Sequence, residues 1–277
     1  MKPIINILPK NKIVDNVLSY IYFLRTQHRI PLYKRQLIND ELYKIKTGSE
    51  IENPLRVFTS DKEYVKVYVK AIVGDKYNVE TIKVLRSKTD VDNYEFPTRC
   101  CIKPTHASGR FIIRRNGENL PIEEIKQWLD INYYHDSQER NYKNLIPKII
   151  VEPLVFDSEN IEDFKFFCYF GKVKFIQIDL NRNSNHTRKF YTIDWNPLDF
   201  TINFPLSNRE IKKPSCLKEM INVCEQLSSH FSLVRVDLYT NNSRFIVGEI
   251  THCAEGGVGR FMPRESEYTA SKLLFSD

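Results

Sequence analysis

Apolar residues in the first half of the chain recur mostly at helical spacing. In residues 10–58 they return every three or four positions, which predicts helices with a break at Pro31. Residues 61–74 predict a further helix that ends at Gly74, although the alternation in YVKVYVKAIV also fits a strand. We also predict a helix over residues 120–134, and two strands around a loop in residues 98–115.

The second half of the chain is richer in predicted strands. Three runs, PKIIVEPLV, FKFFCYFG and KVKFIQIDL, are typical of strands, and Gly171 with Lys172 predicts the turn between the last two. Ser215 begins a predicted helix, and VRVDLY with IVGEIT predicts a hairpin closed by residues 240–244. This order of elements favours an α+β fold with two lobes packed over a cleft.

Composition places the chain among globular proteins. It has 277 residues, of which 42% are hydrophobic and 27% charged. The apolar runs are too short for a transmembrane segment, and the start, MKPIINILPKNK, lacks the features of a signal peptide, so we expect a cytoplasmic protein. Six cysteines without a C-x-x-C pair are typical of reduced, mostly buried thiols.

The net charge of +6 is concentrated at the N-terminal end. Residues 1–60 contain ten Lys or Arg and five Asp or Glu, so this part carries +5. Such a region suits an anionic partner, although an ordinary solvated surface explains it equally well. The chain has no helix-turn-helix, zinc-finger or RNP motif, and we therefore expect no nucleic-acid partner.

Two carboxylates lie in the predicted hairpin. Asp237 is in one strand and Glu249 is in the other, so both side chains reach one face of the hairpin if the register allows it. Mg²⁺ is commonly held by one or two carboxylates together with substrate phosphates. The alternative is a pair of acids on the solvated face of the hairpin.

Several cations lie at strand ends or between apolar neighbours. Lys103 precedes Pro104 and the loop Thr105-His106-Ala107-Ser108-Gly109, whose hydroxyls and N–H groups suit a phosphate. Lys165 alternates with apolar residues, so either Asp163, Glu152 or a bound phosphate must neutralise it. Glu152 ends a strand that we expect at a sheet edge, and Arg182 follows another strand.

The order of these segments resembles a known family. The chain is similar to the ATP-grasp superfamily in the order of its segments. These are the strand with Lys103 and its loop, then IIVEPL, DFKFFCYFGKVKFI, a later arginine, RVDLY and GEIT. Within it, the phrases KFFCYFGKVKFI, FYTIDWN and RVDLY resemble the TupA-like group, which is associated with teichuronopeptide and other bacterial surface polysaccharides. The resemblance covers roughly residues 58–265.

The resemblance implies an ATP-grasp fold in which two α+β lobes clasp the nucleotide, preceded by a helical N-terminal extension. It divides the chain into a helical, basic region (1–58), a small lobe with the phosphate loop (59–145) and a large lobe with the metal site (146–277). The implied cofactors are ATP and Mg²⁺.

The resemblance also implies site residues. Those for ATP are Lys103 and Lys165 at the phosphates and adenine edge, His106, Ser108 and Gly109 in the loop, and Glu152, Pro153 and Leu154 on the adenine and ribose strand. Arg182 is expected at the γ-phosphate, Arg260 at the substrate carboxylate, and Asp237 with Glu249 at Mg²⁺. Two positions depart from the family pattern, because Thr251 replaces a common Asn and Ala107 replaces a common Gly.

The function implied by the resemblance is ATP-dependent ligation of a carboxylate to an amine through an acyl-phosphate. The expected partners are a carboxylate-bearing sugar or polysaccharide acceptor, such as a uronic acid or an amino-acid component, and an amino acid or another amine donor. The chain shows no recognisable nucleophile and base triad, which agrees with such chemistry. A phosphotransferase of the same fold and a non-catalytic nucleotide- or polysaccharide-binding protein remain alternatives.

Overall fold

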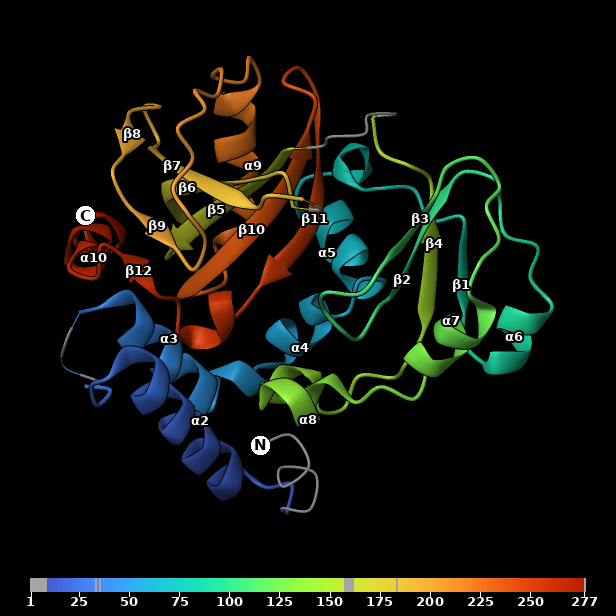
Figure 1. Ribbon diagram of the computed structural model, residues 1–277, viewed down its shortest axis with the longest axis horizontal. Helices are drawn as coiled ribbons and strands as arrows, with labels where there is room; N and C mark the ends of the chain where they lie inside the picture. The colour runs from blue at the N-terminus through green and yellow to red at the C-terminus, as the bar shows by residue number, and fades with distance from the viewer. Residues whose placement is uncertain (1–8, 33, 35, 157–161, 183, 277) are drawn as a thin grey trace.

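The computed structural model describes residues 9–32, 34, 36–156, 162–182 and 184–276. Two antiparallel sheets lie side by side, and helices α4 and α8 lie between and below them in the view of Figure 1, above α2. The helices are α2 (Lys12–Gln27), α3 (Ile38–Thr47), α4 (Pro54–Ser60), α5 (Tyr64–Ile72), α6 (Lys88–Asp92), α7 (Ile122–Trp128), α8 (Tyr133–Ser137), α9 (Leu217–Ser228) and α10 (Ser266–Phe275). Single 3-10 turns are η1 (Glu50–Glu52), η2 (Asp75–Tyr77), η3 (Arg140–Tyr142) and η4 (Ala254–Gly257).

The first sheet has four strands in the order β1-β4-β2-β3. They are β1 (Lys83–Leu85), β4 (Ile149–Glu152), β2 (Cys100–Pro104) and β3 (Ile112–Arg114). One face of this sheet is apolar, because Ile102 and Val151 pack with Trp128 of α7 in a buried core. Side chains alternate along a strand, so Lys103 and Glu152 belong to the opposite face.

The second sheet has six strands in the order β11-β10-β5-β6-β7-β8. They are β11 (Phe245–Thr251), β10 (Leu233–Thr240), β5 (Glu162–Tyr169), β6 (Lys172–Leu180), β7 (Thr187–Thr192) and β8 (Pro197–Leu198). A short pair, β9 (Thr201–Ile202) with β12 (Phe261–Met262), lies beside it.

The two faces of the second sheet differ in chemistry. On one face, Phe164, Phe166 and Val236 are fully buried with α9 and α5. On the other face, Phe167 and Phe175 join α3 and α10 in a second apolar cluster, but only toward one end of the strands. Toward the other end the same face carries acidic and basic side chains, and this half of the face borders the candidate site.

The predicted α+β organisation is confirmed, and the structure corrects it in places. The helix predicted over residues 120–134 is divided, because the N–H groups of Leu129, Asp130 and Ile131 bond three residues back and end α7 in a tight turn. The prediction that Glu152 lies on an edge strand was wrong, because β4 is paired on both sides, with β1 and β2. The boundary between the small and large lobes was expected between residues 145 and 146. This would put β4 in the large lobe, whereas the structure pairs β4 with the strands of the first sheet.

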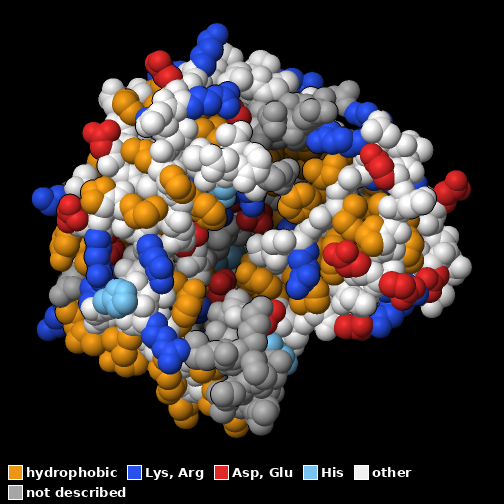
Figure 2. Space-filling view, in the orientation of Figure 1, with side chains coloured by type: hydrophobic (Ala, Val, Ile, Leu, Met, Phe, Trp, Pro, Cys, Tyr) orange, Lys and Arg blue, Asp and Glu red, His pale blue; other side chains and the backbone are white. Residues whose placement is uncertain are grey.

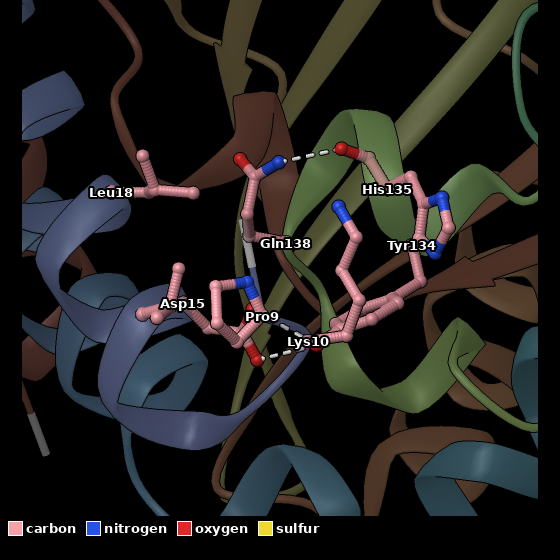
Figure 3. A pocket seen from close by; sticks show the side chains of 8 residues that line it. Pro9, Lys10, Asp15, Leu18, Tyr134, His135 and Gln138 are labelled. Carbon is pink, nitrogen blue, oxygen red and sulfur yellow. Dashed lines mark hydrogen bonds between the residues drawn. The ribbon is translucent and has the colours of Figure 1, made fainter. Parts of the chain in front are cut away.

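The helical start of the chain is tied to α8. A hollow of about 10 Å³ separates α2 from α8, and this is room for about one water molecule, not for a ligand (Figure 3). Beside it the Tyr134 hydroxyl donates to Asp15 at 2.8 Å. No helix in the ranges that the structure describes has both the length and the apolar character needed to cross a membrane.

Candidate active site

A cavity of about 630 Å³ lies between the two sheets. Figure 2 shows it as a hollow near the centre of the molecule, with charged side chains at its floor. It falls in the size range of small-molecule and cofactor sites. The cavity is lined by ten of the twelve residues that the sequence selected: Lys103, Ser108, Gly109, Glu152, Pro153, Leu154, Lys165, Arg182, Asp237 and Glu249.

The structure does not bring the other two selected residues to this cavity. His106 is 3% exposed, and its Nδ1 accepts a hydrogen bond from the Lys148 N–H, so it joins the ends of β2 and β4. Burial lowers the pKa of His106, which favours the neutral ring. The side chain of Arg260 is exposed, while its backbone exchanges hydrogen bonds with Asn203.

The first sheet contributes a buried acid between two lysines. Lys103 Nζ lies 2.6 Å from Glu152 Oε2, and Lys66 Nζ lies 2.5 Å from Glu152 Oε1. Burial disfavours the charge of Glu152, but the two ammonium groups outweigh it and lower the pKa of this carboxyl. Only Lys103 of the two lysines lines the cavity, so it is the cation that a ligand can reach there.

The second sheet contributes a buried cation between acids. Lys165 Nζ lies 2.6 Å from Asp163 Oδ2 and 2.7 Å from Asp237 Oδ2. Burial disfavours the charge of Lys165, but the neighbouring carboxylates raise its pKa, so the ammonium form persists. Arg182 Nη1 lies 2.7 Å from the same oxygen of Asp163. The alternation of charged and apolar residues in DFKFF predicted this side-chain direction.

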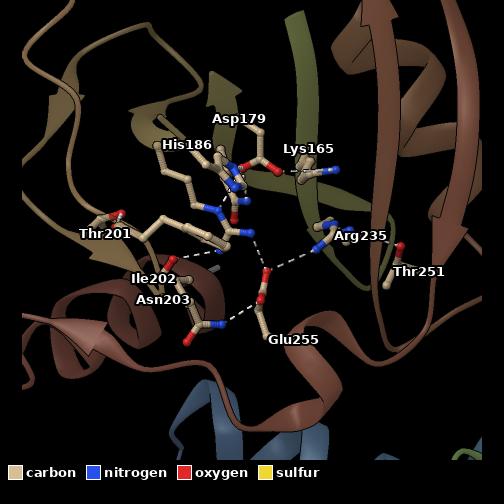
Figure 4. A network of polar contacts seen from close by, with 12 residues as sticks. Lys165, Asp179, His186, Thr201, Ile202, Asn203, Arg235, Thr251 and Glu255 are labelled. Carbon is tan, nitrogen blue, oxygen red and sulfur yellow. Dashed lines mark hydrogen bonds and ion pairs between the residues drawn. The ribbon is translucent and has the colours of Figure 1, made fainter. Parts of the chain in front are cut away.

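Two arginines that the sequence analysis did not select complete the charged face. Arg235 holds both oxygens of Asp237, each at 2.7 Å. Arg188 contacts Asp179 at 2.8 Å and Glu255 at 2.9 Å. Figure 4 shows Glu255 between Arg235 and Asn203, both of which it contacts. A signal for Arg235 exists in the sequence, because it stands two residues before Asp237 and strand side chains alternate. Arg188 lies on β7, a strand that the sequence analysis did not predict.

The two predicted metal ligands face each other across the hairpin. Asp237 and Glu249 are cross-strand partners, and the ladder is irregular directly after Asp237. Glu249 is partly open to solvent, with its side chain 35% exposed, whereas Arg235 and Lys165 already engage Asp237. Across the described ranges, no group of three or more His, Cys, Asp or Glu is arranged to hold a metal ion. Two carboxylates fit an Mg²⁺ that takes its remaining ligands from phosphates and water.

The two departures from the family pattern also lie at the site. The Thr251 hydroxyl donates to Glu249 at 3.3 Å and lines the cavity, so an oxygen is present where an Asn is common. Lys62 Nζ donates to the carbonyl of Ala107 at 2.6 Å and fixes the start of the loop. Gly109 has a φ of +75°, a conformation that suits glycine, and its position is exposed.

A buried acid that sequence reasoning missed also lines the cavity. Glu139 is 8% exposed and stands between α8 and η3. The pKa of Glu139 is raised to about 7, chiefly by burial; Lys46 opposes this shift and the charge of Glu249 adds to it. No periodicity in the surrounding HDSQERNYK marks this residue, because its burial depends on contacts with distant helices.

Comparison with known families identifies the sequence class. A family model described as TupA-like ATPgrasp matches residues 41–272, which is most of the chain. The match begins within α3, so it includes part of the helical region that the sequence analysis treated as an extension. The predicted resemblance is therefore confirmed, and so is the fold that it implied. No curated protein matches the chain in a sequence search.

Three solved structures with a similar arrangement are distant in sequence. An L-amino acid ligase from Bacillus licheniformis is 10% identical, with a TM-score of 0.47. The match covers 89% of this chain and 56% of the ligase chain. D-Alanine-D-alanine ligase from Helicobacter pylori is 15% identical with a TM-score of 0.42, covering 79% and 61%. The ATP-grasp ligase PsnB, complexed with a minimal precursor, is 11% identical with a TM-score of 0.41, covering 72% and 54%. The chain thus spans between half and two thirds of these proteins.

We expect Lys165→Met to destabilise the protein by about 3 to 5 kcal/mol, because Asp163 and Asp237 would keep buried charges without this partner. Urea unfolding measures the change. The matched control is Lys172→Met on the next strand, whose ion pair with Glu225 at 3.4 Å is largely exposed, and whose loss should cost less than about 1 kcal/mol. Equal stability of the two variants would contradict the role assigned to Lys165.

We expect Glu139→Gln to stabilise the protein at pH 8 but hardly at pH 5. An ordinary glutamate has a pKa of 4.5 in the unfolded chain, against about 7 here, so the folded state holds more protons between these values and loses stability as pH rises. Each pKa unit corresponds to about 1.4 kcal/mol, which gives a gain of about 3 kcal/mol for Gln at pH 8. Urea unfolding at both pH values tests this, and an unchanged difference between them would refute it.

Proposed function

The chain belongs to the TupA-like ATP-grasp family, and from this premise we propose that it is an ATP-dependent ligase joining a carboxylate to an amine. In this reaction an oxygen of the substrate carboxylate attacks the γ-phosphorus of ATP, and the bond from that phosphorus to ADP breaks. The amine nitrogen then attacks the carbonyl carbon of the acyl-phosphate, phosphate leaves, and the nitrogen releases a proton. The products are an amide, ADP and phosphate.

The observation that supports this proposal most directly is that Lys103 and Lys165, which come from different sheets, line the same cavity. Phosphoryl transfer depends on alignment and on neutralising charge, and buried ammonium groups supply both. We assign Lys103 and Lys165 to the ATP phosphates. Arg182, whose guanidinium is 49% exposed, is free enough to turn from Asp163 toward the γ-phosphate.

The remaining assignments divide the cavity between the base and the phosphates. Glu152, Pro153 and Leu154 follow one another along its wall and are assigned to adenine and ribose. Ser108 and Gly109 are exposed in the loop that follows β2 and that Lys62 contacts at Ala107, and we assign them to cover the phosphates. Asp237 and Glu249 would hold Mg²⁺, which when bound neutralises phosphate charge.

For the acceptor we propose a uronic acid or an amino-acid component of a bacterial surface polysaccharide, made in the cytoplasm where ATP is available. The support is the family resemblance and the net charge of +5 in residues 1–60, which suits an anionic chain.

Hydroxylamine separates the proposed ligase from its alternatives. With a carboxylate acceptor, ATP, Mg²⁺ and hydroxylamine, a ligase releases ADP and forms a hydroxamate. A phosphotransferase of the same fold releases ADP but yields a phosphorylated acceptor and no hydroxamate. A binding protein releases no ADP above background with any acceptor in a panel of uronic acids, amino acids and their polymers.

We expect Lys103→Met to weaken ADP binding by on the order of 1.5 to 3 kcal/mol, because it removes a hydrogen bond to a charged group. Calorimetric titration of ADP with Mg²⁺ measures this. Lys66→Met is the matched control, since it removes the other ammonium bound to Glu152 but does not line the cavity. Equal losses in the two variants would show that the effect passes through Glu152 and not through contact with the nucleotide.

We expect Glu249→Gln to raise the Mg²⁺ concentration needed for half-maximal ATP turnover at least tenfold. Gln keeps the shape of the side chain but removes the charge that would bind the ion. Among the described residues, the contacts of Glu249 that the change would disturb are long ones, to Thr251 at 3.3 Å and to Arg235 at 3.9 Å. Circular dichroism checks that the fold persists. A wild-type Mg²⁺ dependence in this variant would remove Glu249 from the metal site.

A further inference from the structure

Almost every carboxylate that lines the cavity has a cation partner. Seven of the eight lie within 4.0 Å of a Lys or Arg nitrogen: Glu152, Glu162, Asp163, Asp179, Asp237, Glu249 and Glu255. Within the described ranges of the chain, Glu139 is the exception, and its carboxylate forms neither a hydrogen bond nor an ion pair there. A carboxylate that is 8% exposed and has no partner is costly, so its presence at a cavity wall points to a ligand.

The segment around Glu139 is fixed on both sides. Arg140 is buried, forms an ion pair with Glu52 at 3.1 Å and donates to the carbonyl of Thr47 at 3.1 Å. Asn141 donates to the Ser60 hydroxyl at 2.8 Å. These contacts bind η3 to the helical start of the chain and hold Glu139 at the wall.

The helix before Glu139 is held in the same way. Tyr134 donates to Asp15 of α2, and Gln138, which has a φ of 54°, donates from its side chain to the carbonyl of His135 at 2.8 Å (Figure 3). These contacts fix the backbone on both sides of Glu139, so its carboxylate stands at the cavity wall before any ligand binds.

The neighbours of Glu139 suit an ammonium group. Tyr133 and Tyr142 line the same cavity, with their rings edge to face at 4.7 Å. Aromatic rings and a carboxylate together attract organic cations. The charge of Glu249 acts on the hydroxyls of both tyrosines, which places this second acid in the same part of the cavity.

The basic residue that acts most on Glu139 does not neutralise it. Lys46 is buried, but its ammonium donates to the carbonyl of Gly256 at 3.2 Å and forms no ion pair with Glu139 within 4.0 Å. The remaining charge is therefore available to a ligand.

We propose that Glu139, which lines the same cavity as Tyr133 and Tyr142, binds the ammonium group of the amine substrate. The chemical class is a primary aliphatic amine, such as the amino group of an amino acid. This inference rests on the ligase function proposed above and names the part of the cavity that receives the second substrate. Glu139 is a binding residue, because it would touch the amine itself.

The test uses two small probes with the full chain in the presence of ADP and Mg²⁺. Glycinamide carries an ammonium group, and glycolamide has a neutral hydroxyl in its place. Ligand-observed NMR titration gives the affinity of each. We expect the wild-type protein to bind glycinamide at least ten times more tightly than glycolamide, and Glu139→Gln to remove this preference while ADP affinity stays within twofold.

Glu162→Gln is the matched control, because Glu162 lines the same cavity but is paired with Arg209 at 3.1 Å. It should keep the preference for glycinamide. The proposal is overturned if wild-type protein does not bind glycinamide or binds both probes equally, or if Glu139→Gln keeps the preference. It is also overturned if Glu139→Gln changes the Mg²⁺ dependence of ADP binding and leaves glycinamide affinity unchanged, which would make Glu139 a metal ligand.

The titrations also separate this inference from the function on which it rests. If ADP fails to bind while glycinamide keeps its preference, the ligase proposal fails and the ammonium site stands. If ADP binds as expected and the preference is absent, only the assignment of Glu139 fails.

Discussion

The structure depends on a charge that an apolar sheet cannot bury alone. Lys165 is 4% exposed in the middle of β5, with fully buried Phe164 and Phe166 on either side of it in sequence. Its ammonium is stable there only because Asp163 precedes it on the same face and Asp237 lies opposite it on β10. The two carboxylates together carry more negative charge than one ammonium cancels, and Arg235, which holds both oxygens of Asp237, balances the excess. Each buried charge is therefore stabilised by a neighbour of opposite charge. These ion pairs continue along the sheet through Asp179 to Arg188 and Glu255.

This arrangement determines how a nucleotide can enter. Among the residues that the structure describes, nine Lys or Arg and eight Asp or Glu line the cavity, so the described charges nearly balance. Lys103, Lys165 and Arg182 are each paired with a carboxylate, so a polyphosphate bound to them as proposed must replace these carboxylates, whereas Lys62, Arg110 and Arg115 form no ion pair within the described ranges. Such an exchange at Lys103 and Lys165 costs less than desolvating fresh charges, because their ammonium groups are already largely out of water.

Sequence reasoning succeeded where strand alternation alone fixes a side chain's direction. Lys165, Asp237 and Glu249 were found because their neighbours are apolar on both sides, and a period of two then puts all three on the polar face. It failed where position depends on pairing between distant segments. Glu152 lies inside a sheet, not at its edge, because β1 comes from residues far earlier in the chain. His106 is in the phosphate-like loop by sequence, yet the Lys148 backbone holds it away from the cavity, and Arg188 sits on a strand whose polar sequence hides it.

The position of Glu139 in the site could not be predicted from the local sequence pattern. Its environment is made by four separate segments: α8 and η3 beside it, the helices that hold Arg140, β11 with Glu249, and the turn that contains Gly256. A fold selected only for stability would place a neutral or apolar residue here, because burial without a partner raises the free energy of the charged form. The other cavity acids are kept charged by cations that the chain itself supplies. In the part of the chain that the structure describes, Glu139 is the cavity acid left without such a partner, and its backbone is fixed at the cavity wall; this combination favours a cation brought by the substrate over a role in stabilising the fold.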